Sequence, residues 1–150
     1  MATLNNPKIT PYLWFDNQAQ EAAQFYCSLF KNSKLISQSA QLVEFELDGL
    51  RMMGLNGGPH FKFTEAVSFM ILCEDQTEVD HFWTSLTADG GEEGRCGWCK
   101  DKYGLSWQVV PQEFMNMMQS GNSDQVMAVT EAMMKMNKFI LAELEKAYAM

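Results

Sequence analysis

The chain has 150 residues, of which 47% are hydrophobic and 20% charged, with 11 Lys and Arg against 19 Asp and Glu. This length and apolar content suffice for one globular domain that folds without disulfides or structural metals. The net charge of −8 argues against nucleic acid and anionic membranes as partners, because a surface of the same sign cannot attract the protein by releasing counterions.

No segment of the sequence looks like a leader or a membrane span. The first residues lack a basic region followed by an apolar run, and no apolar run approaches the roughly 18 residues of a membrane helix. Four cysteines in such a chain are expected to be reduced thiols rather than a disulfide framework. We therefore expect a cytoplasmic protein.

The first half of the chain alternates between strand-like and helix-like patterns. The predicted elements are a strand at 9–15, a helix at 18–30 and strands at 35–39, 41–47 and 50–55. Asp48 and Gly49 separate the last two strands. This pair favours a tight hairpin, because both central positions of a type I′ turn require positive φ.

The same order of elements recurs after a loop at 56–65. The predicted elements are a strand at 66–73, a helix at 76–87 and strands at 91–95, 96–100 and 105–110. When Glu21 is set on Glu78, Phe25 coincides with Phe82, so the two helices are related by an internal repeat. The sequence therefore predicts two βαβββ units, at about 7–56 and 65–111, within one domain of residues 1–111.

The last part of the chain, residues 112–150, is predicted to be a helical extension. A short helix ends near Gly121, and one long helix runs from Asp124 to about Tyr148. The long helix carries more apolar residues than one narrow face can hold. We expect the extension either to pack on the same domain or to form a dimer contact.

Four stretches of the chain carry a resemblance to a known family. They are PYLWFDNQAQEAAQFYCSLF, LNGGPHFKFTEAVSF, CGWCKDKYGLSWQVVP and VTEAMMKMNKFILAELEKAYA. With the repeated βαβββ unit, they resemble the vicinal oxygen chelate superfamily of glyoxalases, bleomycin-resistance proteins and extradiol dioxygenases. Within it they look like the PhnB-like subfamily, also labelled 3-demethylubiquinone-9 3-methyltransferase domain proteins. The resemblance implies an α+β fold with paired βαβββ units forming a cupped mixed sheet, C-terminal helices, and a homodimer.

Metal-using members of that superfamily place His, Glu or Gln on the first and fourth strands of each unit. The repeat places these positions at Thr10 (or Ile9), Met53, Ser68 and Gln108. Two hydroxyls, a thioether and an amide lack the anionic or imidazole donors that supply most of the binding energy for a divalent ion. The sequence therefore predicts no metal site and no cofactor.

Two other chemistries lack the local structure they need. Methyl transfer from S-adenosylmethionine usually requires a Gly-rich turn between a strand and a helix, and neither NGGPH nor GGEEG has that setting. The C-x-x-C spacing of Cys96 and Cys99 is followed by a turn and a strand, not by the helix that would lower a thiol pKa. We expect structural thiols that lie on one strand and point to opposite faces.

The remaining candidate site is a small-molecule pocket with apolar and aromatic walls and a few polar groups. Its predicted lining residues are Tyr12, Trp14, Arg51, Met53, Ser68, Met70 and Gln108, with Asn56, His60 and Phe63 near the mouth. Arg51 either binds a carboxylate, phosphate or carbonyl group of the ligand or pairs with an internal acid. His60 is either a pocket residue or an exposed loop histidine.

Three functions fit these features. The first is a metal-independent small-molecule-binding protein, or an enzyme of undefined activity. The second is a metal-dependent lyase or dioxygenase, in which His60, Gln108 and a carboxylate from a partner chain would complete the site. The third is sequestration of a cationic drug, as bleomycin-binding relatives do. The acidic net charge and the aromatic walls of the predicted pocket favour this function.

Overall fold

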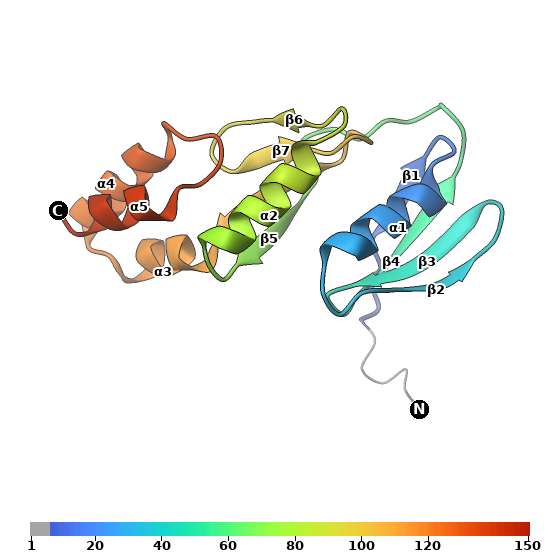
Figure 1. The fold of residues 1–150 in the computed structure, drawn as a ribbon, viewed down its shortest axis with the longest axis horizontal. Coiled ribbons are helices and arrows are strands. Elements are labelled where there is room, and N and C mark those ends of the chain that lie inside the picture. The colour runs from blue at the N-terminus through green and yellow to red at the C-terminus, as the bar shows by residue number, and fades with distance from the viewer. Residues whose placement is uncertain (1–6) are drawn as a thin grey trace. The chain divides into compact units, whose positions relative to one another are not determined.

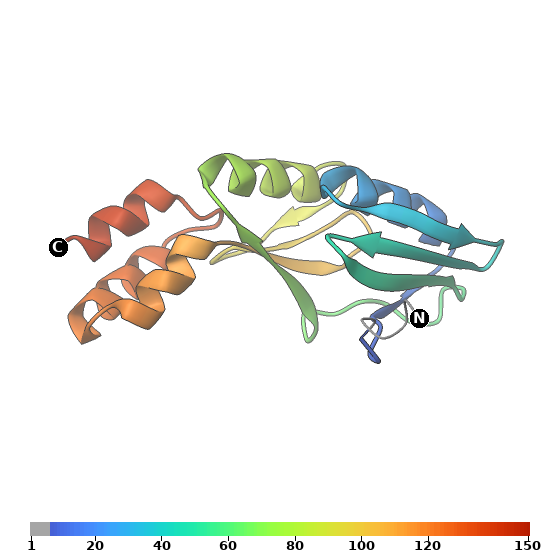
Figure 2. The ribbon, with the colours of Figure 1, turned by 90° about the horizontal axis from the view of Figure 1, so that it is seen from below.

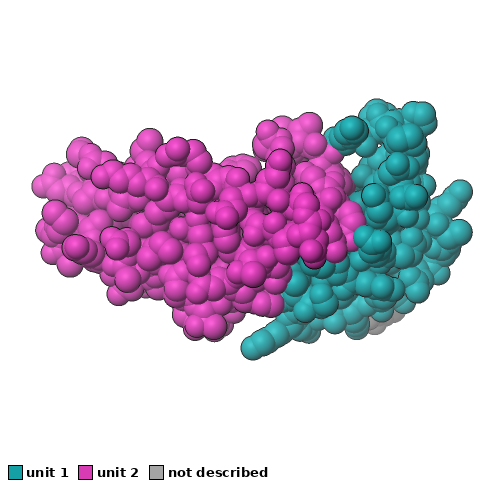
Figure 3. Space-filling model, turned by 45° about the horizontal axis from the view of Figure 1, so that its top comes forward, with its two compact units in different colours: residues 1–62 teal, residues 63–150 magenta. Residues whose placement is uncertain are grey.

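The structure is a computed structural model that describes residues 7–150. The chain divides into two compact units, residues 1–62 and 63–150, coloured separately in Figure 3. Each unit holds one four-stranded sheet and a helix that packs on it (Figures 1 and 2). The N-terminal residues 1–6, where we expect no leader, lie outside the described residues. The predicted α+β class with paired βαβββ units is confirmed.

The first unit has the predicted element order. Its elements are β1 (Tyr12–Phe15), α1 (Ala19–Leu29), β2 (Lys34–Gln38), β3 (Leu42–Leu47) and β4 (Leu50–Asn56). The strand order is β1-β4-β3-β2, with β1 parallel to β4 and the other neighbours antiparallel. The hairpin between β3 and β4 turns at Asp48 and Gly49, which have φ of 48° and 83°. The sequence predicted this turn because it supplies residues that tolerate positive φ.

The core of the first unit lies between α1 and one face of its sheet. Small side chains at Ala19, Ala22 and Ala23 are fully buried and let the helix approach the strands closely. Tyr26 then stacks on Phe45 of β3, with ring centroids 6.4 Å apart. Apolar residues at every second strand position therefore face α1, which is why period-two alternation predicted these strands.

The second unit repeats this arrangement with shorter outer strands. Its sheet elements are β5 (Ser68–Cys73), α2 (Gln76–Thr87), β6 (Glu92–Glu93), β7 (Trp98–Lys100) and β8 (Ser106–Pro111). The strand order is β5-β8-β7-β6, with β5 parallel to β8. Val79, Phe82, Trp83 and Leu86 bury one stripe of α2.

The strand predicted at 96–100 begins later than expected. Cys96 and Gly97 have φ of 57° and 85° and form a turn, which the Trp98 N–H closes by donating to the Arg95 carbonyl at 3.0 Å. Only Cys99 of the C-x-x-C pair lies on β7. The prediction that both cysteines share a strand was wrong, because positive φ at two successive residues is incompatible with a strand.

The C-terminal extension consists of three helices, α3 (Gln112–Ser120), α4 (Ser123–Met133) and α5 (Leu141–Tyr148). The single long helix predicted from Asp124 to about Tyr148 was therefore wrong. The carbonyls of Met136 and Asn137 accept hydrogen bonds from the Cys96 and Gly97 N–H groups, both at 2.8 Å. A continuous helix would have kept these carbonyls for its own hydrogen bonds. Residues 136–137 bind the turn at 96–97, and this interrupts the helix between α4 and α5. The two helices nevertheless pack against each other (Figure 1).

Within residues 7–150, none of the helices combines the length and the apolar character needed to cross a bilayer.

Candidate functional site

Each sheet has one face toward its own helix and one face turned away, which we call the far face. Figure 2 shows α1 and α2 running along their sheets on the helix side. In the first unit, alternation and strand register place a mixed set of residues on the far face: Tyr12, Trp14, Leu42, Glu44, Glu46, Arg51, Met53 and Leu55. All four pocket residues predicted on β1 and β4 are among them.

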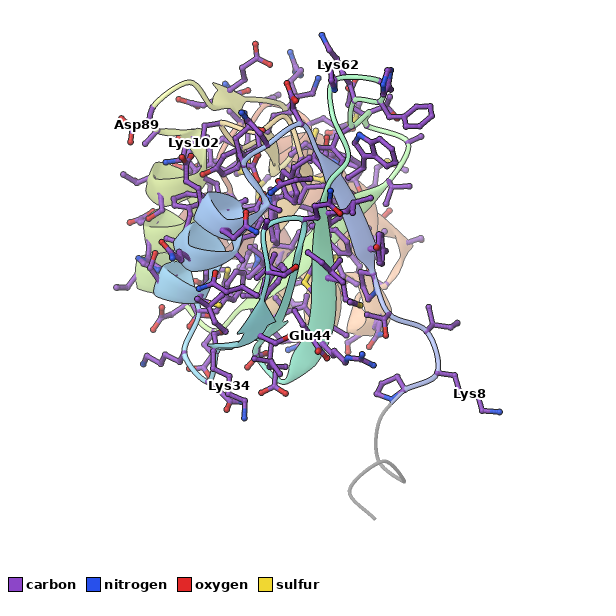
Figure 4. All side chains as sticks on the ribbon, turned by 90° about the vertical axis from the view of Figure 1, so that its right-hand side faces the viewer. Lys8, Lys34, Glu44, Lys62, Asp89 and Lys102 are labelled. Atoms are coloured by element: carbon purple, nitrogen blue, oxygen red, sulfur yellow. The ribbon has the colours of Figure 1, made fainter. Side chains whose placement is uncertain are left out.

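Arg51 forms an ion pair on this far face. Its Nε donates a hydrogen bond to a carboxylate oxygen of Glu44, and the two side chains are 41% and 22% exposed. Glu44, labelled in Figure 4, lies directly opposite Met53 in the register of β3 and β4. Of the two alternatives for Arg51, the structure shows the pairing with an internal acid. The charge of the guanidinium is therefore balanced within the sheet.

Trp14 holds the loop that follows β4. Its Nε1–H donates to the Gly58 carbonyl at 2.9 Å, and its ring meets Phe61 edge-on with centroids 4.9 Å apart. A Cβ at Gly57 would lie 2.4 Å from the Trp14 ring, so only glycine fits beneath it. His60, in the same loop, is exposed. The structure thus brings Trp14 to the loop that carries His60.

Asn56, predicted at the mouth of the pocket, makes three hydrogen bonds within the first unit. Its Oδ1 accepts from the Ala19 N–H at 2.8 Å, and its Nδ2 donates to Gln20 Oε1 at 2.8 Å and to the Ala40 carbonyl at 3.1 Å. Its side chain therefore joins the end of β4 to the start of α1. Phe63, the other predicted mouth residue, is half-buried and belongs to the second unit.

The far face of the second sheet carries both polar and apolar side chains. They are Ser68, Met70, Leu72, Trp98, Lys100, Ser106, Gln108 and Val110. Gln108 Nε2 donates a hydrogen bond to Ser68 Oγ at 3.0 Å, so two predicted site residues contact each other directly. Met70, opposite Gln108 in register, is 46% exposed.

The two sheets place Met53 and Gln108 at equivalent points. Met53 lies opposite Tyr12 across β4 and β1, as Gln108 lies opposite Met70 across β8 and β5. Two residues before Tyr12 and Met70 come Thr10 and Ser68, the other two positions where metal-using relatives carry ligands.

This donor set does not fit a divalent ion. It contains no carboxylate and no imidazole, only two hydroxyls, a thioether and a neutral amide. Within residues 7–150, no three His, Cys, Asp or Glu side chains gather where they could hold a metal together.

The cysteines are free thiols. Burial raises the pKa of Cys99 to about 12, with Asp101 and Glu93 adding to the effect, and burial likewise raises the pKa of Cys73 to about 12. Burial also raises the pKa of Cys27. A thiol that stays protonated is a poor nucleophile, so the Cys99 environment does not suit disulfide exchange.

Sequence reasoning missed two buried polar residues of the second unit. The Asp101 carboxylate accepts hydrogen bonds from the Tyr103 and Leu105 N–H groups and from Trp107 Nε1–H, at 2.9, 3.1 and 2.9 Å. An Asp at the start of the turn DKYG signals such a side-chain-capped turn. Ser106, 1% exposed, had no such signal, because its environment depends on packing across the sheet.

Comparison with known proteins agrees with this architecture. The family described as 3-demethylubiquinone-9 3-methyltransferase matches residues 7–110. A solved structure from Bacillus cereus, described as a 3-demethylubiquinone-9 3-methyltransferase, PhnB protein, is 30% identical, with a TM-score of 0.65 over 70% of this chain and 99% of that one. No curated protein matches the chain.

Two more distant structures share the fold. The fosfomycin resistance protein FosX from Listeria monocytogenes, solved with Mn(II) and sulfate, is 17% identical, with a TM-score of 0.53 over 70% of this chain and 89% of that one. A glyoxalase-related enzyme from Fulvimarina pelagi is 13% identical, with a TM-score of 0.50 over 70% of this chain and 88% of that one. The paired βαβββ units and the match over residues 7–110 place this chain in the PhnB-like, 3-demethylubiquinone-9 3-methyltransferase family.

Proposed function

We propose that this PhnB-like protein is a metal-independent small-molecule-binding protein, or an enzyme acting on such a molecule, and that a ligand binds on the far face of a sheet. One observation carries the proposal: large apolar side chains stand exposed on these faces beside paired polar groups. Tyr12 is 54% exposed on the face that also carries the Arg51–Glu44 pair, and Met70, 46% exposed, lies opposite Gln108, which is bonded to Ser68. Apolar surface with a few placed polar groups is the composition of a ligand site.

The donor chemistry supports metal independence. Met53 and Gln108 stand at equivalent points of the two sheets, where a thioether and a neutral amide are weak partners for Zn²⁺, Mn²⁺ or Fe²⁺. The metal-dependent alternative needs His60 to approach Gln108 together with a carboxylate from another chain. Elemental analysis of protein purified without chelator distinguishes the two. We expect far less than one equivalent of Zn, Ni, Mn or Fe, and one equivalent of any of them would overturn metal independence.

Ligand binding is tested by mapping small aromatic fragments on the full chain with ¹H–¹⁵N NMR. We expect saturable shifts at far-face residues, and loss of the shifts around Met70 in Met70→Lys. Ile36→Lys is the matched control, because Ile36 is 45% exposed but lies on β2 of the other unit. Shifts confined to helix surfaces, or unchanged in Met70→Lys, would contradict the proposed site. Tight binding of a basic aromatic antibiotic without turnover would favour sequestration.

The proposal includes a homodimer in the cytoplasm. The apolar residues left exposed on and beside the C-terminal helices, Met127, Met134 and Ile140, are suited to a subunit contact. The free state of Cys27, Cys73, Cys96 and Cys99 supports a reducing compartment.

A further inference from the structure

Ser106 carries a buried hydroxyl that the fold does not satisfy. The residue is 1% exposed, and its Oγ has no hydrogen-bond partner among the described residues. A buried hydroxyl without a hydrogen-bond partner lowers the stability of a protein by about 1–3 kcal/mol, so native structures rarely contain one. Ser106 lies on the far face of the second sheet, between Ser68 on β5 and Lys100 on β7 in the strand register.

Two neighbouring polar groups have hydrogen-bonding capacity beyond the bond that joins them. The bond from Gln108 Nε2 to Ser68 Oγ uses one amide N–H and one hydroxyl lone pair. Gln108 also carries a second N–H and a carbonyl oxygen, and Ser68 carries its own O–H. Together with Ser106, the cluster offers both donors and acceptors within one patch of the sheet.

Lys100 does not make this patch attractive to anions. Its Nζ lies 2.7 Å from a carboxylate oxygen of Glu65, and Glu92 lies opposite it in the register of β6 and β7. The hydrogen bond and charge of Glu65, with a contribution from Glu92, raise the pKa of Lys100, and Lys100 in turn lowers the pKa of Glu65. Two carboxylates around one ammonium leave no net positive charge for a ligand carboxylate or phosphate.

The rest of the patch is apolar. Met70 and Trp98 flank Gln108 in the strand register, and Leu72 continues the row along β5. Met70 and Leu72 are 46% and 45% exposed. A ligand seated here would therefore cover thioether, indole and aliphatic surface with most of its own area.

We propose that Ser68, Ser106 and Gln108 form a subsite for an uncharged hydrogen-bonding group, a carboxamide or a ketone-type carbonyl, of an otherwise apolar ligand. This deepens the proposed function and rests on it. The ligand's group satisfies the Ser106 hydroxyl, while its apolar part packs on Met70 and Trp98. Lys100 neighbours Ser106 in the strand register, and moving its pair with Glu65 aside to admit the ligand costs little because the Glu65 side chain is 65% exposed.

Three probes of similar shape and different charge test the ligand class: benzamide, benzoate and benzylammonium. We expect benzamide to give saturable ¹H–¹⁵N shifts at the backbone amides of Ser68 and Ser106 and at the Gln108 side-chain NH₂ group. Benzoate and benzylammonium should bind at least about fivefold more weakly, the change expected when one good hydrogen bond is lost. Equal or tighter binding of either ion at these residues would overturn the uncharged class.

Ser106→Ala separates binding from stability. Because the variant removes an unsatisfied hydroxyl, we expect an unchanged or higher Tm together with about fivefold weaker benzamide binding. Ser120→Ala, at an exposed position at the end of α3, is the matched control and should change neither quantity. A clear fall in Tm or a failure to fold in Ser106→Ala would show that the hydroxyl is satisfied within the protein, which overturns the subsite.

Gln108→Met is a second, independent variant. It places in the second sheet the residue that the first sheet has at Met53, with a similar volume and no amide. We expect it to weaken benzamide at least as much as Ser106→Ala does, and unchanged binding would contradict the subsite. If benzamide still shifted Met70 and Trp98 equally in both variants, the proposal of small-molecule binding would stand. Only the proposed subsite would then be contradicted. If none of the probes shifts a far-face residue of either unit, the proposed function fails as well.

Discussion

Burial of a single thiol determines what the C-x-x-C spacing can do. Cys99 lies on β7, 3% exposed, and burial raises its pKa to about 12. At pH 8 the Cys99 thiol therefore stays protonated, because a pKa far above the pH leaves very little thiolate. Cys96 stands in the preceding turn and is only partly buried. The two cysteines are neighbours in sequence with different chemical environments.

Alkylation of the native protein checks this difference. With iodoacetamide at pH 8, we expect Cys73 and Cys99 to stay unmodified in native protein and to react fully in guanidinium, since unfolding removes the burial that raises their pKa. A higher thiol pKa leaves less thiolate at a given pH, so the thiol is alkylated more slowly. If Cys99 in the native protein were labelled as fast as it is in guanidinium, Cys99 would not be buried in the folded protein.

At the scale of elements, the two helices of the repeat are started by different means. Asp75 caps α2 locally, its side chain accepting from the Glu78 N–H at 2.9 Å. Gln18, at the same place before α1, makes no side-chain cap, and Asn56 from the end of β4 accepts from the Ala19 N–H instead. The first helix therefore depends on a strand that is distant in sequence.

Asn56→Ala tests whether this residue supports the fold or the pocket. We expect a loss of about 1–2 kcal/mol in the free energy of unfolding, measured in urea, because a helix N-terminal N–H loses its acceptor. Asn56→Asp is the control: it keeps the oxygen that accepts from Ala19 and should retain more of the stability. If Asn56→Ala were as stable as the wild type yet bound fragments more weakly, Asn56 would belong to the ligand site rather than to the helix start.

At the scale of the whole molecule, the C-terminal extension belongs to the second unit and leaves several apolar side chains exposed. Phe139 is buried beside Gly97, and Gln76 of α2 donates to the Phe139 carbonyl and accepts from the Leu141 N–H. Deleting everything after Ser120 would therefore remove part of this unit's own core. The proposed dimer contact is better tested at exposed residues.

Met127→Glu is such a test. Met127 is 60% exposed on α4, so a charge there should leave the fold intact and disrupt an apolar subunit contact. By sedimentation velocity at micromolar concentration, we expect a dimer for the wild type, a monomer for Met127→Glu and a dimer for the control Ile36→Glu. A wild-type monomer would refute the homodimer, and a dimeric Met127→Glu would exclude this part of α4 from the contact.

Sequence alone determined the repeated βαβββ units, the hairpin at Asp48–Gly49 and the sheet faces on which Arg51 and Met53, in the first unit, and Gln108, in the second, stand. These features depend on hydrophobic periodicity and on local φ preferences, both of which are set by residues close together in the sequence. Family membership also followed, because the motifs are continuous stretches of the chain.

Tertiary structure alone decided which polar groups meet. The pairing of Arg51 with Glu44 and the bond from Gln108 to Ser68 depend on strand register. The break between α4 and α5 depends on a turn some 40 residues earlier. The unsatisfied hydroxyl of Ser106 lies on β8 between β5 and β7, strands that come from distant parts of the chain. These hydrogen-bond and ion-pair partners come from segments that are distant in sequence, so no local sequence pattern predicts them.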